Sequence, residues 1–176
     1  MFETLRCLSR LSIHCLPAAV ILTVVGMTLR IEAGEYNPVL NIGDKAPAWK
    51  ELPGVDGKQH SLSDLKERDV VVLAFICNSC PYAVDYENRL IAFSKKHSGK
   101  DSRVSIVAVN VNKVEEDLPP KMKEKADAKG FNFPYLFDKD QKIANDYGAG
   151  FTPEFFVLNK DRKVVYMGAM DDSPNA

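Results

Sequence analysis

Residues 70–90 read VVVLAFICNSCPYAVDYENRL, and this stretch decides the fold of the chain. Its first part, Val70–Ile76, is an unbroken apolar run, which predicts a strand buried on both faces of a sheet. The second part repeats apolar residues at three- and four-residue spacing, which predicts a helix. Cys77 and Cys80 stand where the strand passes into the helix. The pair is therefore placed for dithiol chemistry.

The rest of the chain alternates strand and helix patterns. Strands are predicted at 103–111, 133–137, 154–158 and 164–170, helices at 119–130 and 141–147, and a hairpin at 49–61 followed by a helical turn at 61–66. Alternating strands and helices predict an α/β fold with a parallel core, extended by an α-β insertion. The last two strands are joined by Asn159–Arg162, which predicts a closing antiparallel hairpin.

Length and charge set broad limits. The chain has 176 residues, enough for one domain with a real core. Its formal net charge of -1 provides no electrostatic basis for binding nucleic acid or an anionic membrane surface.

The N-terminus has the pattern of a targeting segment. Arg6 and Arg10 precede the uncharged, mostly apolar run Leu16–Leu29, and Ala33 is a small residue at a plausible cleavage point. Residues 1–33 are thus predicted to be a cleaved signal peptide or, alternatively, an N-terminal membrane tether. Both readings place the body of the protein outside the cytoplasm, with a linker at 34–40 and one domain at 41–176.

Removal of that leader would leave Cys77 and Cys80 as the last cysteines of the chain. In dithiol exchange a thiolate attacks, and a helix N-terminus favours negative charge. We therefore expect Cys77 to be the exposed attacking thiol and Cys80, one turn into the helix, to close on it. The alternatives are two buried thiols or a zinc half-site, but zinc needs four ligands, and His60 and His97 are the only histidines after the leader.

A second signal is the segment Gly150–Glu154, GFTPE, just before a predicted strand. A proline there can simply mark a turn or a strand edge. If the Thr152-Pro153 bond is cis, it exposes the backbone of Thr152 beside the dithiol, where an incoming peptide can pair.

Together, VVVLAFICNSCPY, VSIVAVNVN, FPYLFD, YGAGFTPEFFVLN and KVVYMG resemble the thioredoxin-like redoxin superfamily. The resemblance covers Ile42–Met170. It is closest to the extracytoplasmic ResA/TlpA-type thiol-disulfide oxidoreductases and to the peroxiredoxin-like group with a CNxCPY motif. It implies a thioredoxin-like fold, a central mixed sheet flanked by helices. It also implies Cys77 as nucleophile, Cys80 as resolving cysteine and Thr152-Pro153 as a cis-proline site.

The chain departs from these families in three respects. The strand before the cysteines carries no acid for proton transfer, and Glu115 and Glu116 are either its substitutes in a later loop or two solvated carboxylates. The peroxiredoxin motif Pro-x-x-x-Thr-x-x-Cys, aligned on Cys80, finds Leu73 and Cys77 in place of its proline and threonine. Finally, no helix pattern follows the last strand, so the family's C-terminal helix is expected to be missing.

The predicted function is an exported thiol-disulfide oxidoreductase that cycles Cys77 and Cys80 on a protein disulfide substrate. A membrane thiol donor is expected to supply electrons, and no cofactor or metal is expected. The alternatives are a peroxiredoxin-like antioxidant protein, a Sco-like copper-binding chaperone and an inactive module. The copper reading lacks its distal histidine ligand, because no histidine follows His97.

Overall fold

The computed structural model describes residues 37–172, so the predicted leader lies outside the described part. The elements, in chain order, are β1 (Leu52–Pro53), β2 (Gln59–His60), η1 (Leu62–Leu65), β3 (Val70–Phe75), α1 (Pro81–His97), β4 (Val104–Asn110), η2 (Glu115–Asp117), α2 (Pro119–Lys129), β5 (Tyr135–Phe137), α3 (Lys142–Tyr147), β6 (Glu154–Leu158) and β7 (Val164–Gly168). These bounds confirm the predicted α/β order, with α2 and β5 as the α-β insertion.

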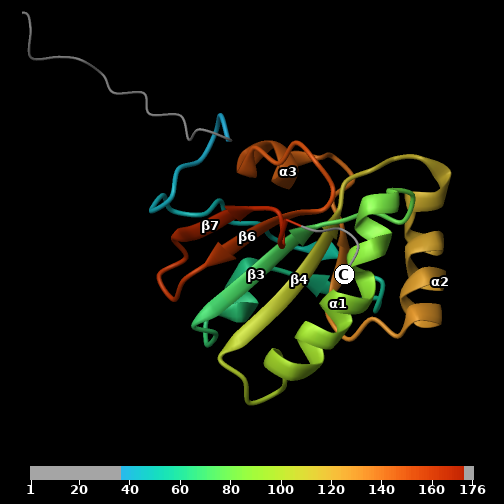
Figure 1. Ribbon diagram of the computed structural model, residues 1–176, viewed down its shortest axis with the longest axis horizontal. Helices are drawn as coiled ribbons and strands as arrows, with labels where there is room; N and C mark the ends of the chain where they lie inside the picture. The colour runs from blue at the N-terminus through green and yellow to red at the C-terminus, as the bar shows by residue number, and fades with distance from the viewer. Residues whose placement is uncertain (1–36, 173–176) are drawn as a thin grey trace, which may run out of the picture. The chain divides into compact units, whose positions relative to one another are not determined.

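The centre of the fold is a five-stranded mixed sheet in the order β5-β4-β3-β6-β7. Figure 1 labels four of these strands, β4, β3, β6 and β7. β3 pairs in parallel with β4, and β4 with β5, whereas β6 and β7 are antiparallel additions. The carboxyl ends of the parallel strands therefore meet at one edge of the sheet. The residues that follow β3 and β4 are brought together at that edge.

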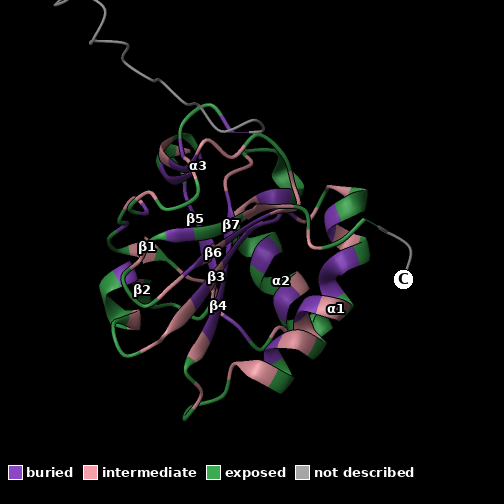
Figure 2. Ribbon diagram, turned by 60° about the vertical axis from the view of Figure 1, so that its left-hand side comes forward, coloured by how far each residue is buried: buried purple, intermediate pink, exposed green. Residues whose placement is uncertain are grey.

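β3 is buried because both faces of the sheet are covered. α1 and α2 pack on one face, where Ala74 and Ile76 contribute to the core. On the other face Val71 and Leu73 pack with residues of η1 and α3. Figure 2 shows α1 and α2 together on one side of the sheet and α3 away from them. Covering both faces accounts for the absence of polar alternation in the strand.

Aromatic side chains fill the second face. The ring centroid of Tyr147 lies 6.0 Å from that of Phe75 and 5.2 Å from that of Phe156, both in edge-on contacts. The Tyr147 hydroxyl donates a hydrogen bond to the Pro47 carbonyl oxygen at 2.9 Å. Burial raises the pKa of the Tyr147 phenol, and the charge of Asp146 adds to the shift.

The described part of the predicted linker, residues 37–40, packs into the domain. Leu40 is buried in the core cluster. Asn37 is also buried, and its Nδ2 donates to the carbonyl oxygen of Tyr147 at 2.8 Å. Asn37 and Leu40 therefore anchor the described part of the predicted linker to the domain.

The segment that follows β7 contacts α1. Between β7 and Asp172 the structure forms no helix. Instead Asp171 accepts a hydrogen bond from the Tyr86 hydroxyl at 3.0 Å and pairs with Arg89, which ties the segment to α1. On β7, Tyr166 stays 44% exposed.

None of the helices within residues 37–172 has the length and apolar character required to span a membrane.

Candidate active site

The two cysteines lie at the carboxyl edge of the sheet. Cys80 is the N-cap residue of α1, with Pro81 at the first helical position, and both thiols are free. The expectation that Cys77 is the more exposed thiol is wrong, because Cys77 is 3% exposed and Cys80 is only partly buried. Cys77 continues the line of the buried strand, whereas Cys80 occupies the open start of the helix.

The Thr152-Pro153 peptide bond is cis, as the sequence predicted. It places two oxygens of Thr152 against the two sulfurs. The Sγ atom of Cys80 donates to the Thr152 carbonyl oxygen at 3.0 Å, and Sγ of Cys77 lies 3.5 Å from the Thr152 hydroxyl. The side chain of Glu154 accepts the backbone N–H groups of Gly150, at 2.8 Å, and Phe151, at 3.3 Å. The segment opposite the dithiol is thus held in place.

The carboxylate that reaches the cysteine motif is Asp117, a residue that the sequence analysis missed. It is fully buried. Its Oδ1 accepts the backbone N–H groups of Asn78 at 2.6 Å and Ser79 at 2.9 Å. Its Oδ2 accepts the Ser79 hydroxyl at 2.6 Å and the Asn112 amide at 3.1 Å. Asp117 therefore contacts the two residues that separate the cysteines.

Glu115 and Glu116, the predicted proton-transfer candidates, are both exposed. The contact that Glu116 makes with the motif comes from its main chain, whose carbonyl oxygen accepts Asn78 Nδ2 at 2.7 Å. The three acids form η2, and a 3-10 helix turns each successive side chain by about 120°. The sequence predicted an acid in this loop, but only the fold of η2 shows that the third one faces inward.

Every polar atom of Asn78 makes a hydrogen bond. Besides its bonds to Asp117 and Glu116, its Oδ1 accepts the Tyr135 hydroxyl at 3.1 Å, and its carbonyl oxygen accepts Lys125 Nζ at 3.1 Å. The pKa of Tyr135 is raised by burial first, and then by the acidic groups of Cys77, Asp117 and Glu87. Tyr135 therefore acts in this site as a neutral hydrogen-bond donor.

Lys125 is held in turn by a buried acid on α1. Glu87 is 3% exposed and lies 2.6 Å from Lys125 Nζ and 3.3 Å from Lys129 Nζ. This buried ion pair links α1 to α2 beside the dithiol loop, Cys77–Cys80, which Lys125 contacts at Asn78. The loop is therefore fixed on one side by Asp117 and on the other by Lys125.

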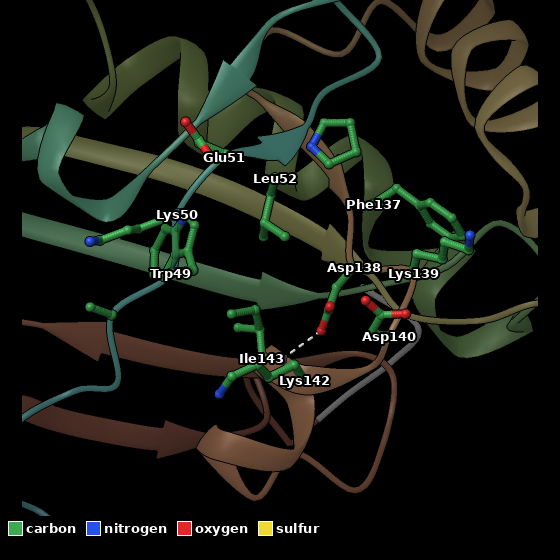
Figure 3. Close-up of a pocket in the computed structure, with 12 residues that line it drawn as sticks. Trp49, Lys50, Glu51, Leu52, Phe137, Asp138, Lys139, Asp140, Lys142 and Ile143 are labelled. Carbon is green, nitrogen blue, oxygen red and sulfur yellow. Dashed lines mark hydrogen bonds between the residues drawn. The ribbon is translucent and has the colours of Figure 1, made fainter.

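A pocket on the described part of the chain lies away from this site. It has a volume of about 590 Å³ and lies between residues 48–53 and the start of α3 (Figure 3). Asp138 closes one side by accepting the N–H of Ile143 at 2.6 Å. Cys77 and Cys80 do not line it. No group of three or more His, Cys, Asp or Glu side chains with metal-binding geometry occurs within residues 37–172.

A Cys-x-x-Cys motif between strand and helix, a cis X-Pro bond beside it and this sheet order define a thioredoxin-like redoxin. Residues 42–167 match the AhpC/TSA family, and the chain belongs to it.

The relatives fall into two groups. The chain is 32% identical to the thiol-disulfide oxidoreductase ResA of Bacillus anthracis, over 80% of this chain and 77% of the relative. It is 31% identical to a candidate peroxiredoxin of Mycobacterium tuberculosis, over 72% of this chain and 83% of the relative. A crystal structure of a candidate thiol:disulfide interchange protein DsbE from Chlorobium tepidum superposes with a TM-score of 0.63 at 26% identity, covering 73% of this chain and 85% of that one.

Proposed function

We propose that this protein is an exported thiol-disulfide oxidoreductase that cycles Cys77 and Cys80 between dithiol and disulfide on protein substrates. The observation that carries the proposal is the contact of both sulfurs with Thr152, at 3.5 Å and 3.0 Å. A cysteine pair beside an exposed peptide segment can exchange disulfides with a bound polypeptide.

The contacts divide the roles of the two thiols. The S–H of Cys80 points to a carbonyl oxygen, an acceptor that stabilises only the protonated thiol. Cys77 instead faces the Thr152 hydroxyl, which can donate to a thiolate. This difference supports Cys77 as the nucleophile and Cys80 as the resolving thiol, even though Cys77 is the more buried residue.

The reaction balances without a cofactor. The Cys77 thiolate attacks one sulfur of a substrate disulfide and releases the other as a thiolate, which takes up a proton. Cys80 then attacks the mixed disulfide, loses its proton and releases the second substrate thiol. The product is a Cys77–Cys80 disulfide, and an external thiol donor must return two electrons. We propose a membrane thiol protein as that donor.

Reduction of insulin by the full-length protein, with dithiothreitol as electron donor, tests this proposal. We expect C77S to abolish the reaction. C80S, reduced beforehand and mixed with insulin after removal of dithiothreitol, should accumulate a mixed disulfide with the substrate that is visible by mass spectrometry. Full activity of C77S would contradict the proposal. A mixed disulfide that forms in C77S, but not in C80S, would reverse the roles of the two thiols.

Export is proposed from the leader pattern of residues 1–33. Mass spectrometry of the protein recovered from fractionated cells tests it. A chain that begins at Gly34 in the extracytoplasmic fraction supports a cleaved signal, and an intact chain in the membrane fraction supports a tether. Recovery of the intact chain in the cytoplasm would contradict export.

A peroxidase activity is the second candidate, because one group of relatives carries a peroxiredoxin name. The position that aligns with the motif's proline is Leu73, which is fully buried within β3. Consumption of hydrogen peroxide with a thiol donor, measured beside the insulin assay, decides between the two activities. We expect insulin reduction to dominate, and a faster peroxide reaction would favour the peroxidase.

A further inference from the structure

The hydrogen bonds of Asp117 bear on the redox balance of the dithiol. Four donors converge on this carboxylate, from Asn78, Ser79 and Asn112, and it donates none in return. Such an arrangement fits an ionised carboxylate, which can only accept. A negative charge of η2 is thus buried against the loop between the two cysteines.

The Ser79 hydroxyl connects this carboxylate to the first sulfur. Its single proton is donated to Asp117 Oδ2 at 2.6 Å, and its oxygen lies 3.9 Å from Cys77 Sγ. With its proton engaged, the hydroxyl meets the sulfur through a lone pair. A lone pair can accept an S–H bond, but it repels a thiolate.

The backbone N–H groups of the loop are engaged in the same way. Unpaired N–H groups near a helix N-terminus stabilise a nearby anion, including a cysteine thiolate. Here the N–H groups of Asn78 and Ser79, the residues between the two cysteines, both point to Asp117. The Thr152 hydroxyl is a donor that still lies in contact with Cys77.

We propose that Asp117 is a positioning residue that turns these donors away from Cys77 and biases the Cys77–Cys80 pair toward the disulfide. The physical reason is that less stabilisation of the Cys77 thiolate raises the free energy of the reduced state. The dithiol is then the stronger reductant. This inference rests on the proposed function and assigns it a direction, the reduction of substrate disulfides.

The equilibrium with glutathione tests this bias. The protein dithiol and one glutathione disulfide give the protein disulfide and two reduced glutathiones, so two S–H bonds and one S–S bond exist on each side. We compare the full-length wild type with D117N, S79A and D127N. D117N keeps one oxygen for the two N–H groups, but its amide donates to Ser79 and frees the hydroxyl proton for Cys77. Asp127 is an exposed carboxylate on α2 and provides the matched control.

We expect D117N to shift the equilibrium toward the dithiol by about tenfold at pH 8, or about 30 mV in potential. The shift should shrink at pH 6, where less thiolate is present in either protein. S79A should shift the equilibrium about threefold in the same direction, because it removes the hydroxyl oxygen whose lone pair faces the Cys77 sulfur. D127N should stay within twofold of the wild type.

An unchanged equilibrium in D117N across this pH range, or a shift toward the disulfide, would overturn the proposal. If D117N does not fold, S79A decides the question, because Ser79 is exposed and its replacement leaves the carboxylate in place. An S79A equilibrium equal to the wild type, or shifted toward the disulfide, would then overturn it. The measurement uses no protein substrate, so a failure of insulin reduction leaves its result intact.

Discussion

The Sγ atom of Cys80 donates to the carbonyl oxygen of Thr152 at 3.0 Å, although the two residues are 72 positions apart in the chain. The bond joins the N-cap of α1 to the segment that precedes β6. Because β3 and β6 are adjacent antiparallel strands, the end of one and the start of the other meet at the same sheet edge. The active site is thus assembled by strand pairing rather than by local sequence.

Replacing Thr152 with valine tests the contact with Cys77. The change removes the hydroxyl that lies 3.5 Å from the Cys77 sulfur and retains the carbonyl oxygen that accepts Cys80. We expect alkylation of Cys77 by iodoacetamide at pH 7 to slow by about threefold to tenfold, the effect of one lost hydrogen bond. Alkylation of Cys80 in the same sample, followed by peptide mapping, is the internal control. Equal rates for Cys77 in both proteins would show that the hydroxyl does not assist the thiolate.

Removing one partner of the buried ion pair should destabilise the domain. In K125M, Glu87 keeps only the longer contact to Lys129, at 3.3 Å. We expect a loss of about 3 kcal/mol in the free energy of unfolding, because a buried charge loses its closest partner. Urea denaturation measures this loss.

The matched control lies on the same helix. Lys123 pairs with Asp127 at the surface, where both side chains are more than half exposed, and K123M should change the unfolding free energy by less than about 1 kcal/mol. The double variant E87L/K125M should recover part of the loss, because no buried charge is left unpaired and Lys129, which also loses Glu87, is 42% exposed. Similar stabilities for K125M and K123M would contradict the role assigned to the buried pair.

The sequence predicted the elements whose pattern is local. The run Val70–Ile76 identified the central strand, which the structure ends at Phe75, and the combination of Thr152-Pro153 with the cysteine motif predicted the cis bond. It did not predict the burial of Cys77, because exposure depends on what packs against the strand end. Asp117 was missed for a similar reason. Nothing in the run of three acids marks which side chain faces the motif until η2 is formed.

The hydroxyl of Tyr135 is expected to help hold the dithiol loop. Y135F removes the donor to Asn78 Oδ1, which lies 3.1 Å away, and leaves that oxygen without its partner. We expect a loss of about 1–2 kcal/mol in stability, measured by urea denaturation. In parallel, amide hydrogen exchange of Asn78 and Ser79 should be faster than in the wild type. Unchanged exchange at both amides would show that Asp117 and Lys125 suffice to hold the loop.

Tyr147 makes stability depend on pH in the alkaline range. Its folded pKa is raised by burial, whereas in the unfolded chain a tyrosine ionises near about pH 10. Above that pH the unfolded state loses the proton first, so it binds fewer protons than the folded state, and the free energy of unfolding falls. The contribution of this group is therefore fully present below about pH 10 and is lost as the pH rises toward the folded pKa.

Y147F separates this effect from general alkaline damage. At pH 7 the variant should be less stable by about 1–3 kcal/mol, because the Pro47 carbonyl oxygen loses its donor. From about pH 10 to pH 11 the wild type begins to lose the tyrosine contribution and the variant does not, so the difference between their urea midpoints should start to shrink. Y82F is the control, because the Tyr82 side chain is 63% exposed, and its difference from the wild type should stay constant. A Y147F difference that remains constant across this range would mean that Tyr147 does not set the alkaline limit of the fold.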